Sequence, residues 1–383
     1  MHRFSISISP YIYMASVSSK KIIFTVTNDI SYDQRMSRIC TSLANAGYDV
    51  TIIGFERVNS IPLAERPYRQ ISIKGIPEKG KMLYFKYWIK LYRLLLQLEA
   101  DAICAIDLDT ILPVYRATRR KGIRRVYDAH EIFTELKEVV VKRSSTIIWG
   151  RMAKKLIPRF PHGYTIGKYY AQYFRERYGV SYEIVRNATV LREDHTPDPA
   201  EKKKYILYQG AVNHGRCFEQ LIPAMKAVDA DLIICGNGNF FEQAQALTRE
   251  HGLTGKIHFK GYIPPAELQE YTREAAIGIT LFEADNVLSN YYSMANRFFD
   301  YMHHGVAQLC NAYPEYADVN KKYEIAVLIP DTAPETIADA LNKLVKDDAF
   351  RIRLGSNALE ARKEYCWQEE EKRLLNFYDR LFR

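Results

Sequence analysis

No uninterrupted apolar run in this 383-residue chain approaches the ~20 residues that a helix needs to span a bilayer. The chain has no CxxC pair either. Its six cysteines stand far apart, several of them in apolar segments such as "DAICAI" and "LIICG". This spacing argues against a zinc site or a disulfide framework, and it favours buried, reduced thiols in a reducing compartment.

Glycine is missing from the loop that follows the first predicted strand, "TNDISYDQRM" (27–36). A dinucleotide-binding turn at that place needs a GxGxxG pattern, in which the glycines let the backbone approach a pyrophosphate. The absence of that pattern argues against a nicotinamide or flavin enzyme in the first half of the chain.

The composition is that of a folded globular protein, with 47% apolar and 26% charged residues. The length fits two domains. Residues 1–20 mix a few apolar residues with serines, which predicts a flexible leader and not a signal peptide. A true start at Met14 is the alternative.

The net charge of +9 is unevenly spread along the chain. Residues 1–190 contain 31 Lys and Arg against 16 Asp and Glu, whereas residues 191–383 contain 23 against 29. A basic half joined to an acidic half indicates that the first half meets something anionic. Nucleic acid, a phospholipid surface and a phosphate-bearing acceptor all meet that description.

Apolar strands alternate with helices along both halves, which predicts an α/β protein with parallel sheets. We predict two Rossmann-like domains in series, with a cleft between them. The predicted strands are 21–27, 48–55, 101–106, 123–128 and 163–166 in the first domain, and 205–210, 230–236, 256–261, 277–282 and 306–311 in the second.

The domains are predicted over 21–190 and 205–365, joined by a Pro- and charge-rich linker at 191–204. A C-terminal helix over 366–383 could cross back to the first domain. Ligands of such sheets lie beyond the carboxyl ends of the strands, so the loops that follow strands should carry the chemistry.

Two loops of the first domain offer polar side chains. The loop at 27–36 presents Asn28, Asp29 and Arg35 to an acceptor, and it also resembles a capped helix start, with Ser31 or Asp33 as N-cap.

The second of these loops, "YDAHEIFTE" (127–135), places His130 and Glu131 just past a central strand. His130 could hydrogen-bond a sugar hydroxyl, act as an acid or base, or be structural.

Two glycine turns follow strands of the second domain. In "YQGAVNHGRCFEQLI", Gly210 and Gly215 allow a tight strand-to-helix turn, and Arg216 can bind phosphate oxygens near a helix start. In "ICGNGN", Gly236 and Gly238 either pack closely against a neighbour or let a base or ribose approach the backbone.

The stretch "SNYYSMANRFFDYMHHG" (289–305) predicts an amphipathic helix that Ser293 or Asn296 caps and that Gly305 ends. Asn296 and Asp300 share a face away from the apolar stripe. The first turn would offer N–H groups to a diphosphate, and Asp300 would accept hydroxyl hydrogens from a ribose. The expected donor-binding segment is Tyr292, Ser293, Met294, Ala295 and Asn296.

Taken together, these motifs resemble the family 4 (group 1) retaining glycosyltransferases of the GT-B fold. The similarity rests on "GAVNHGRCFEQLI", on "CGNG", on "GYIPPAEL" and on "NRFFDYMHHGVAQL", which is similar to the family's "NKLFEYMAAGVPVI". The segments "TNDISYDQRM" and "YDAHEIF" resemble the branch found in bacterial surface-polysaccharide gene clusters.

The resemblance implies a role for particular residues. Arg216 stands where the family's lysine binds the donor diphosphate, and Asp300 falls on the second glutamate of its E-x7-E motif. Tyr292 replaces the first glutamate, and Ala211 replaces an arginine. His130 falls where the family often has a histidine near the transferred sugar. Arg216, His130 and Asp300 are thus the expected catalytic residues.

The implied chemistry is retaining transfer of a sugar from a nucleotide-diphosphate donor to a glycan or a polyprenyl-diphosphate-linked acceptor. The nucleotide-sugar is a substrate, so no cofactor is expected, and no metal. The acidic pair in "IDLDT", Asp107 and Asp109, imitates a metal motif but is expected to be structural or acceptor-side.

The segment "KGKMLYFKYWIKLYRLLLQLE" (79–99) interleaves basic and aromatic residues. It predicts either a helix packed on the sheet with a basic outer face, or one in weak contact with an anionic membrane. The expected location is the cytoplasm, with peripheral attachment to the inner face of the membrane. The alternative functions are a sugar-nucleotide epimerase or hydrolase, and a non-enzymatic nucleic-acid- or membrane-binding protein. We do not expect nucleic acid as a partner, because it leaves "GAVNHGRCFEQLI" unexplained.

Overall fold

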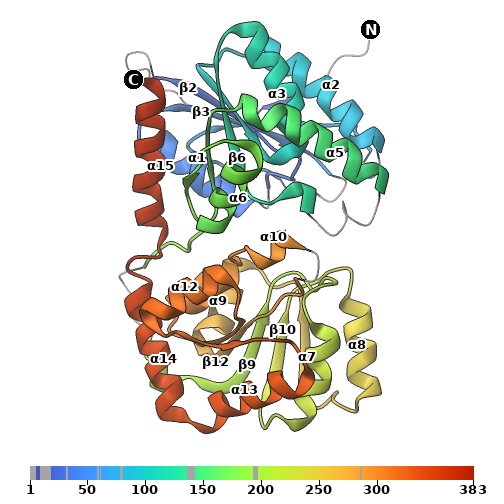
Figure 1. Cartoon of the computed structure of the whole chain (residues 1–383), viewed down its shortest axis with the longest axis vertical. Coiled ribbons are helices and arrows are strands. Elements are labelled where there is room, and N and C mark those ends of the chain that lie inside the picture. The colour runs from blue at the N-terminus through green and yellow to red at the C-terminus, as the bar shows by residue number, and fades with distance from the viewer. Residues whose placement is uncertain are drawn as a thin grey trace. The chain divides into compact units, whose positions relative to one another are not determined.

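The computed structural model describes residues 6–8, 19–31, 33–57, 60, 62–77, 81–135, 143–192, 197–284 and 287–383. They form two compact units (Figure 1). Unit 1 comprises Met1–Arg186 and Glu371–Arg383, and unit 2 comprises Asn187–Glu370. The division falls just before the segment that the sequence suggests as a linker, of which residues 193–196 lie outside the described residues.

Unit 1 is built on a sheet with the strand order β1-β4-β3-β2-β5-β6-β7-β8. Only β1 and β4 pair antiparallel, and the other neighbours are parallel. The strands are β1 (Ile6–Ile8), β2 (Lys21–Thr25), β3 (Asp49–Phe55), β4 (Arg69–Ile73), β5 (Ala102–Ile106), β6 (Arg124–Ala129), β7 (His162–Thr165) and β8 (Glu183–Ile184). The helices are α1 (Gln34–Asn45), α2 (Lys81–Gln97), α3 (Asp107–Lys121), α5 (Arg143–Leu156) and α6 (Lys168–Tyr178).

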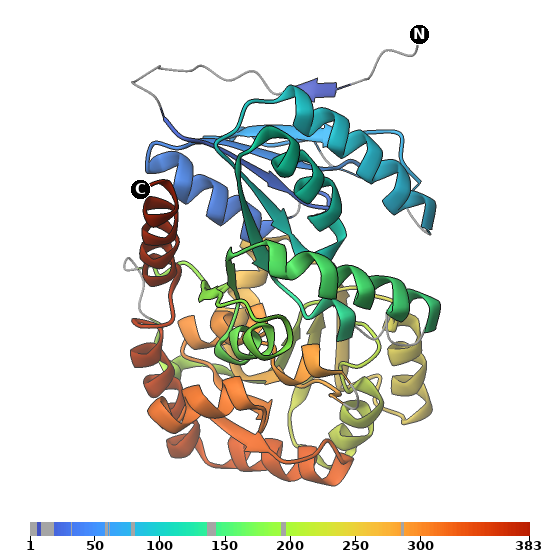
Figure 2. The same ribbon diagram turned by 45° about the horizontal axis from the view of Figure 1, so that its top comes forward.

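The five strands that the sequence predicts for the first domain are present as β2, β3, β5, β6 and β7, whereas β1, β4 and β8 were missed. β1 lies inside the predicted leader and pairs with β4, Ile6 opposite Ile73. The helices α2, α3 and α5 lie side by side (Figures 1 and 2). Trp149 of α5 contacts the rings of Tyr84 and Trp88 on α2.

The last helix, α15 (Trp367–Phe382), ends in unit 1. Tyr378 is fully buried there, with its ring 6.1 Å from Phe24 of β2 and 6.3 Å from Tyr164 of β7. The final turns of the chain therefore complete the core of the unit that the first residues begin.

Unit 2 contains an all-parallel sheet with the order β11-β10-β9-β12-β13-β14. Its strands are β9 (Lys203–Gln209), β10 (Asp231–Cys235), β11 (Ile257–Gly261), β12 (Ala275–Thr280), β13 (Ala307–Asn311) and β14 (Ala326–Ile329). Its helices are α7 (Phe218–Ala224), α8 (Phe241–Glu250), α9 (Pro265–Glu274), α10 (Leu288–Tyr291), α11 (Asn296–His303), α12 (Pro314–Tyr323), α13 (Pro334–Lys346) and α14 (Asp348–Ala361). The five predicted strands are β9 to β13, and β14 was missed.

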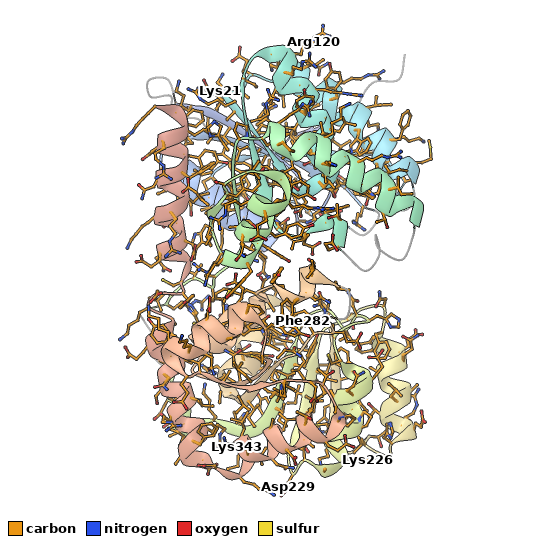
Figure 3. All side chains as sticks on the ribbon, viewed as in Figure 1. Lys21, Arg120, Lys226, Asp229, Phe282 and Lys343 are labelled. Atoms are coloured by element: carbon orange, nitrogen blue, oxygen red, sulfur yellow. The ribbon has the colours of Figure 1, made fainter. Side chains whose placement is uncertain are left out.

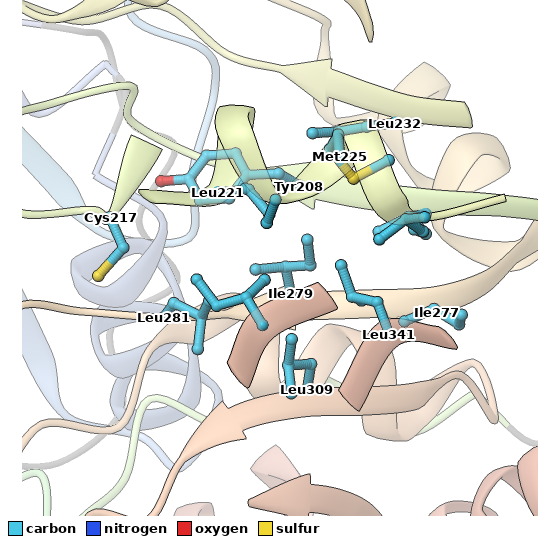
Figure 4. Close-up of a cluster of buried hydrophobic side chains, with 14 of the residues drawn as sticks. Tyr208, Cys217, Leu221, Met225, Leu232, Ile277, Ile279, Leu281, Leu309 and Leu341 are labelled. Carbon is cyan, nitrogen blue, oxygen red and sulfur yellow. The ribbon is translucent and has the colours of Figure 1, made fainter. Parts of the chain in front are cut away.

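Alternate residues of β9 enter different cores, as the two-residue period of a strand requires. Ile206 and Tyr208 belong to a cluster that includes Leu221 of α7 and Leu341 of α13 (Figure 4). Leu207 belongs to another, which includes Tyr301 of α11. Helices therefore cover both faces of the sheet, which is why the central residues of β9, β10 and β12 are mostly apolar.

The absence of a side chain at Gly278 of β12 brings α11 close to the sheet. A Cβ at that position would lie 2.4 Å from the ring of Tyr301. The Tyr301 hydroxyl donates to the Leu207 carbonyl at 2.9 Å and accepts from the Gln209 N–H at 3.2 Å. This pair of hydrogen bonds attaches α11 to the carboxyl end of β9.

We predict that Gly278→Ala destabilises unit 2 by roughly 1–3 kcal/mol, because the added methyl group overpacks the ring of Tyr301. Urea unfolding followed by fluorescence measures the change. Gly255→Ala, at a position with open space around the new Cβ, is the matched control and should change stability by less than about 0.5 kcal/mol. Equal effects of the two substitutions would contradict the packing described.

Candidate functional site

The chain reverses direction across each sheet at one point. In unit 2 it runs from β9 outward to β11 and then returns to β12, on the other side of β9. In unit 1 the corresponding neighbours are β2 and β5. Loops that leave the carboxyl ends of such neighbouring strands diverge, and ligands bind between them. We therefore located the predicted residues relative to these two switch points.

The glycines after β9 and β10 pack the two loops against each other. Gly210 and Gly236 have φ values of 121° and 146°, in the region that favours glycine. A Cβ at Gly236 would lie 1.8 Å from the Gly210 oxygen, and one at Gly238 2.2 Å from the Val212 oxygen. Of the two alternatives for Gly236 and Gly238, close packing is therefore observed.

Arg216 is half-buried and precedes α7 by two residues. Its guanidinium lies 4.3 Å from the ring of Phe282, which follows β12. Figure 3 shows Phe282 at the opposite end of the unit 2 strands from Asp229, which lies at their amino ends. The Glu283 N–H donates to the Gly215 oxygen at 3.0 Å, so the loops after β9 and β12 meet beside Arg216.

Asp300 lies at the same edge of the sheet. Its Oδ2 accepts a hydrogen bond from Gln209 Nε2 at 3.0 Å, directly before the Gly210 turn, and its Oδ1 accepts one from Thr189 Oγ1 at 2.6 Å. Each carboxylate oxygen can accept a second hydrogen bond. Arg216 and Asp300 thus share the carboxyl edge of the sheet at the switch point.

The predicted helix over 289–305 is interrupted. α10 ends at Tyr291 and α11 begins at Asn296, so Tyr292, Ser293 and Ala295 lie in the connecting turn. The prediction of a side-chain cap was wrong: Ala295 is the N-cap, and Ser293 Oγ donates to the Asn290 oxygen.

Two other residues of the predicted donor segment have neighbours inside unit 2. Met294 is 6% exposed and packs in the core with Phe298 and Tyr316, so its side chain does not face a ligand. The exposed Asn296 accepts a hydrogen bond from Asn187 Nδ2 at 2.6 Å through its Oδ1.

In unit 1, the loop after β2 turns back on itself. Asp29 accepts hydrogen bonds from Ser31 and Ser60, and Asn28 Nδ2 donates to Asp33 Oδ2 at 3.3 Å. Asp33 also accepts from the Met36 N–H, which makes it the N-cap of α1, one of the two residues predicted for that place.

His130 stands at the centre of a charged cluster beyond β6. Its Nε2 lies 2.7 Å from Arg35 Nε and 2.8 Å from Asp128 Oδ2. Its backbone N–H donates to Asp107 Oδ1 at 2.8 Å, and so does the N–H of Glu131 at 3.2 Å. The side chain of His130 remains 16% exposed, so one part of the imidazole reaches the surface of the unit.

Arg35 differs from what the sequence suggests. It is 5% exposed, and it donates to His130, to Asp128 Oδ1 at 3.0 Å and to the Val185 oxygen at 3.1 Å. A guanidinium with these partners does not itself face an acceptor. It fixes the imidazole of His130 in place.

Burial raises the pKa of each acid in this cluster, and neighbouring charges decide the net shift. It raises the pKa of Asp107 to about 8 and that of Asp109 to about 7. Burial also opposes ionisation of Asp128 and His130, but the adjacent Arg35 guanidinium lowers the pKa of Asp128, and the Asp128 carboxylate raises the pKa of His130. The Asp128 carboxylate thus favours the protonated imidazole, whereas burial and the Arg35 guanidinium oppose it.

Sequence reasoning missed several residues of both sites. Gln209 and Thr189 hydrogen-bond to Asp300, and Phe282 contacts Arg216. Gln209 stands in the stretch that contains Arg216, but no sequence pattern links any of these three residues to its partner. Asp128, which ends a predicted strand, could have been found as a polar residue at the end of an apolar run.

The described residues contain neither a group of metal ligands nor a membrane-spanning helix. Within those ranges, no three or more His, Cys, Asp or Glu side chains are grouped so that they could hold a metal ion. No helix in the described part of the chain combines the length and apolarity needed to cross a bilayer. The six cysteines are all described, and they are buried free thiols, as predicted.

Family models match both units. The model for Glycosyltransferase Family 4 matches residues 34–191, and the model for Glycosyl transferases group 1 matches residues 192–361. The chain belongs to this glycosyltransferase family. The resemblance noted in the sequence motifs is thereby confirmed.

Curated relatives of this glycosyltransferase are distant. An uncharacterized glycosyltransferase of Methanocaldococcus jannaschii is 21% identical over 185 residues, 46% of this chain and 45% of the relative. A D-inositol 3-phosphate glycosyltransferase of Corynebacterium jeikeium is 28% identical over 165 residues, 39% of this chain and 35% of the relative. The matches thus span less than half of each relative.

Solved structures share the fold along nearly the whole glycosyltransferase chain. Sucrose-phosphate synthase from Thermosynechococcus elongatus has a TM-score of 0.80 at 16% identity, covering 95% of this chain and 99% of that one. WaaG, a glycosyltransferase of lipopolysaccharide biosynthesis, has a TM-score of 0.69 at 14% identity, and the match covers 92% of this chain and 98% of that one. Anabaena HepE in complex with UDP and glucose has a TM-score of 0.71 at 12% identity, and the match covers 94% of this chain and 99% of that one. The fold is therefore the GT-B fold predicted from the motifs.

The His130 cluster should make unit 1 less stable as the pH rises from about 4 to about 8. Above about pH 4 the folded state keeps protons on Asp107 and Asp109 that the unfolded chain has released, and above about pH 6.5 it does so on His130 as well, because all three folded pKa values are raised. Each extra proton lowers the free energy of unfolding by about 1.4 kcal/mol per pH unit. Thermal unfolding across this range should show the decline, and Asp107→Asn with Asp109→Asn should flatten it. A wild-type stability that rises over the same range would contradict the cluster's predicted ionisation.

Proposed function

We propose that this chain is a retaining glycosyltransferase that moves a sugar from a nucleoside diphosphate to a hydroxyl of a glycan or of a polyprenyl-diphosphate-linked acceptor. We place it in the synthesis of a bacterial surface polysaccharide. The observation that carries the proposal is the convergence of Arg216, Asp300 and the Gly210 turn at the switch point of unit 2. A guanidinium suits a diphosphate, and a carboxylate suits the hydroxyls of a ribose.

The relatives guide the choice of donor and pathway. The HepE structure contains UDP and glucose, and WaaG acts in lipopolysaccharide biosynthesis. UDP-linked sugars are therefore the first donors to test, and a growing surface glycan is the first acceptor. Both assignments come from similarity to proteins that share the fold.

In the proposed reaction the oxygen of the acceptor hydroxyl forms a bond to the anomeric carbon while the bond from that carbon to the diphosphate oxygen breaks. The bond's electron pair leaves with the diphosphate, and the acceptor's proton passes to a phosphate oxygen on the same face. Arg216 offsets the charge that develops on the diphosphate. Positioning of the two substrates supplies much of the rate.

In unit 1 we assign His130 to a hydroxyl of the transferred sugar. Its ring is held by Arg35 and Asp128, and its backbone by Asp107, so its exposed edge has a fixed direction. We assign Asn28, Asp29 and Glu131 to the acceptor, because they lie in the loops that leave β2 and β6 at the carboxyl edge of the sheet.

Donor binding tests the proposal. UDP-glucose, UDP-N-acetylglucosamine and GDP-mannose should be screened by thermal shift, and at least one should raise the melting temperature of the wild type. Arg216→Ala and Asp300→Ala should reduce that rise, as a tenfold loss of affinity removes about 1.4 kcal/mol of ligand stabilisation. Arg353→Ala, at an exposed ion pair with Glu324 in the same unit, is the matched control. If all three variants respond like the wild type, the donor site lies elsewhere.

We also propose that unit 1 makes weak contact with an anionic membrane through α2 and α5. Met82, Phe85 and Ile89 on α2 are 52%, 57% and 36% exposed, and Ile147 and Ile148 on α5 are 45% and 54% exposed.

Much of the predicted basic and aromatic face of α2 turns out to be engaged inside unit 1. Trp88 donates to the Asp109 oxygen, and Lys90 to the Lys74 oxygen. Lys86 and Arg93 remain exposed beside the apolar residues, which suits an interfacial helix. Lys79 lies outside the described residues.

Flotation with vesicles of anionic phospholipid at low salt tests this contact. The wild type should float with the vesicles, and Phe85→Glu combined with Ile148→Glu should remain at the bottom of the gradient, because the new charges would have to enter the interface. Tyr262→Glu, which changes an aromatic residue of unit 2 that is 61% exposed, should float like the wild type. Failure of the wild type to float at low salt would remove the membrane contact and leave the transferase proposal intact.

A further inference from the structure

Arg297, the second residue of α11, is a buried cation at the switch point of unit 2. It is 7% exposed. Its Nε donates to the Ile279 oxygen at 3.1 Å, and its Nη2 makes a long contact of 3.5 Å with the Leu281 oxygen. Among the described residues no carboxylate pairs with it. Its hydrogen-bond partners within the described ranges are therefore backbone carbonyls.

Two aromatic rings flank this guanidinium. Tyr208 of β9 and Phe282 after β12 each have their ring centroid 4.7 Å from the Arg297 guanidinium carbon. Cation–π contact offsets part of the cost of removing an arginine from water, but a neutral ring is no counter-ion. A buried charge without a counter-charge is costly, and such a group at the end of a strand is a candidate binding site for an anion.

The guanidinium is aimed at the glycine turn. A Cβ at Gly210 would lie 3.5 Å from Arg297 Nη1, so the missing side chain leaves that nitrogen facing the turn. The next residue, Ala211, brings no charge of its own. Arg216 lies 4.3 Å from the same Phe282 ring that Arg297 contacts. Two guanidinium groups thus share one aromatic ring at the exit of β9 and β12.

We propose that Arg297 is the second cation of the donor site, and that it binds the diphosphate of the nucleotide together with Arg216. A diphosphate carries at least two negative charges, and it gains more when the bond to the sugar breaks. Arg216 approaches it from the loop before α7, and Arg297 lies beneath the Gly210 turn. This inference rests on the proposed transferase function and names the groups that recognise its leaving group.

Isothermal titration of the intact chain with UDP, UMP and uridine tests the role, with GDP, GMP and guanosine as the parallel series. The variants are titrated with the uridine or the guanosine series, whichever contains the diphosphate that the wild type binds. Arg297→Met should weaken diphosphate binding at least about tenfold, weaken monophosphate binding less, and leave nucleoside binding unchanged. A merely structural role would reduce affinity for all three ligands alike, and that result would overturn the inference.

Arg351→Met is the matched control. Arg351 is 6% exposed in the same unit and donates through Nη1 to the Leu344 oxygen, but it pairs with Asp348 on α14. This variant should lose stability without any change in the ratio of diphosphate to nucleoside affinity. A similar fall in that ratio would also overturn the inference.

If the Arg297→Met protein does not fold, Arg297→Lys is titrated in its place. It keeps a charge beneath the turn but loses the fork of the guanidinium, so the ratio of diphosphate to nucleoside affinity should fall by a smaller factor, roughly threefold to tenfold. An unchanged ratio in a folded Arg297→Lys protein contradicts the inference while the proposed function stands. A wild type that binds neither UDP nor GDP removes the proposed function itself.

Discussion

The hydroxyl of Tyr301 is the contact on which the geometry of the candidate donor site depends. It donates to the Leu207 carbonyl and accepts from the Gln209 N–H, so one side chain attaches α11 to the end of β9. Arg297 and Asp300 precede Tyr301 on the same helix, so their positions follow from this attachment. The ring reaches the sheet only because Gly278 has no side chain. Two hydrogen bonds between the Tyr301 hydroxyl and the backbone of β9, with the absence of a side chain at Gly278, thus set the positions of two charged groups.

The same edge of each sheet collects polar groups for a common reason. The carboxyl ends of parallel strands meet there, and the chain diverges at β9 and β12 in unit 2 and at β2 and β5 in unit 1. In unit 1, Thr27 after β2 donates to Asp109 at the start of α3, which joins the two diverging loops. In unit 2, the Glu283 N–H donates to the Gly215 oxygen. Each pair of loops is therefore held together before any ligand binds.

The sequence predicted the fold well because alternating apolar strands and helices are local signals. One of the strands it missed, β4, carries polar residues inside: Gln70 and Ser72 are each 3% exposed. Arg216 and Asp300, which sequence motifs single out, lie at the same edge of the unit 2 sheet. The sequence could not reveal Gln209 or Thr189 as partners of Asp300, since these contacts join residues 91 and 111 positions apart. It also took Arg35 for an acceptor contact, because burial is not visible in a loop of mixed polarity.

Comparison of the two buried arginines explains why they are assigned different roles. Arg35 is 5% exposed and has the carboxylate of Asp128 beside it, so its charge is balanced inside unit 1 and its function is to orient His130. Arg297 is 7% exposed, a nearly equal burial, but in the described part of the chain its N–H groups reach backbone carbonyls and no carboxylate. Desolvation costs for two guanidinium groups buried to this degree are similar. The difference lies in the counter-charge: Asp128 supplies it for Arg35, whereas no carboxylate among the described residues pairs with Arg297. An arginine that is paired with a carboxylate inside the fold is already neutralised. An arginine that faces a glycine turn and has no paired carboxylate is suited to bind an anionic ligand.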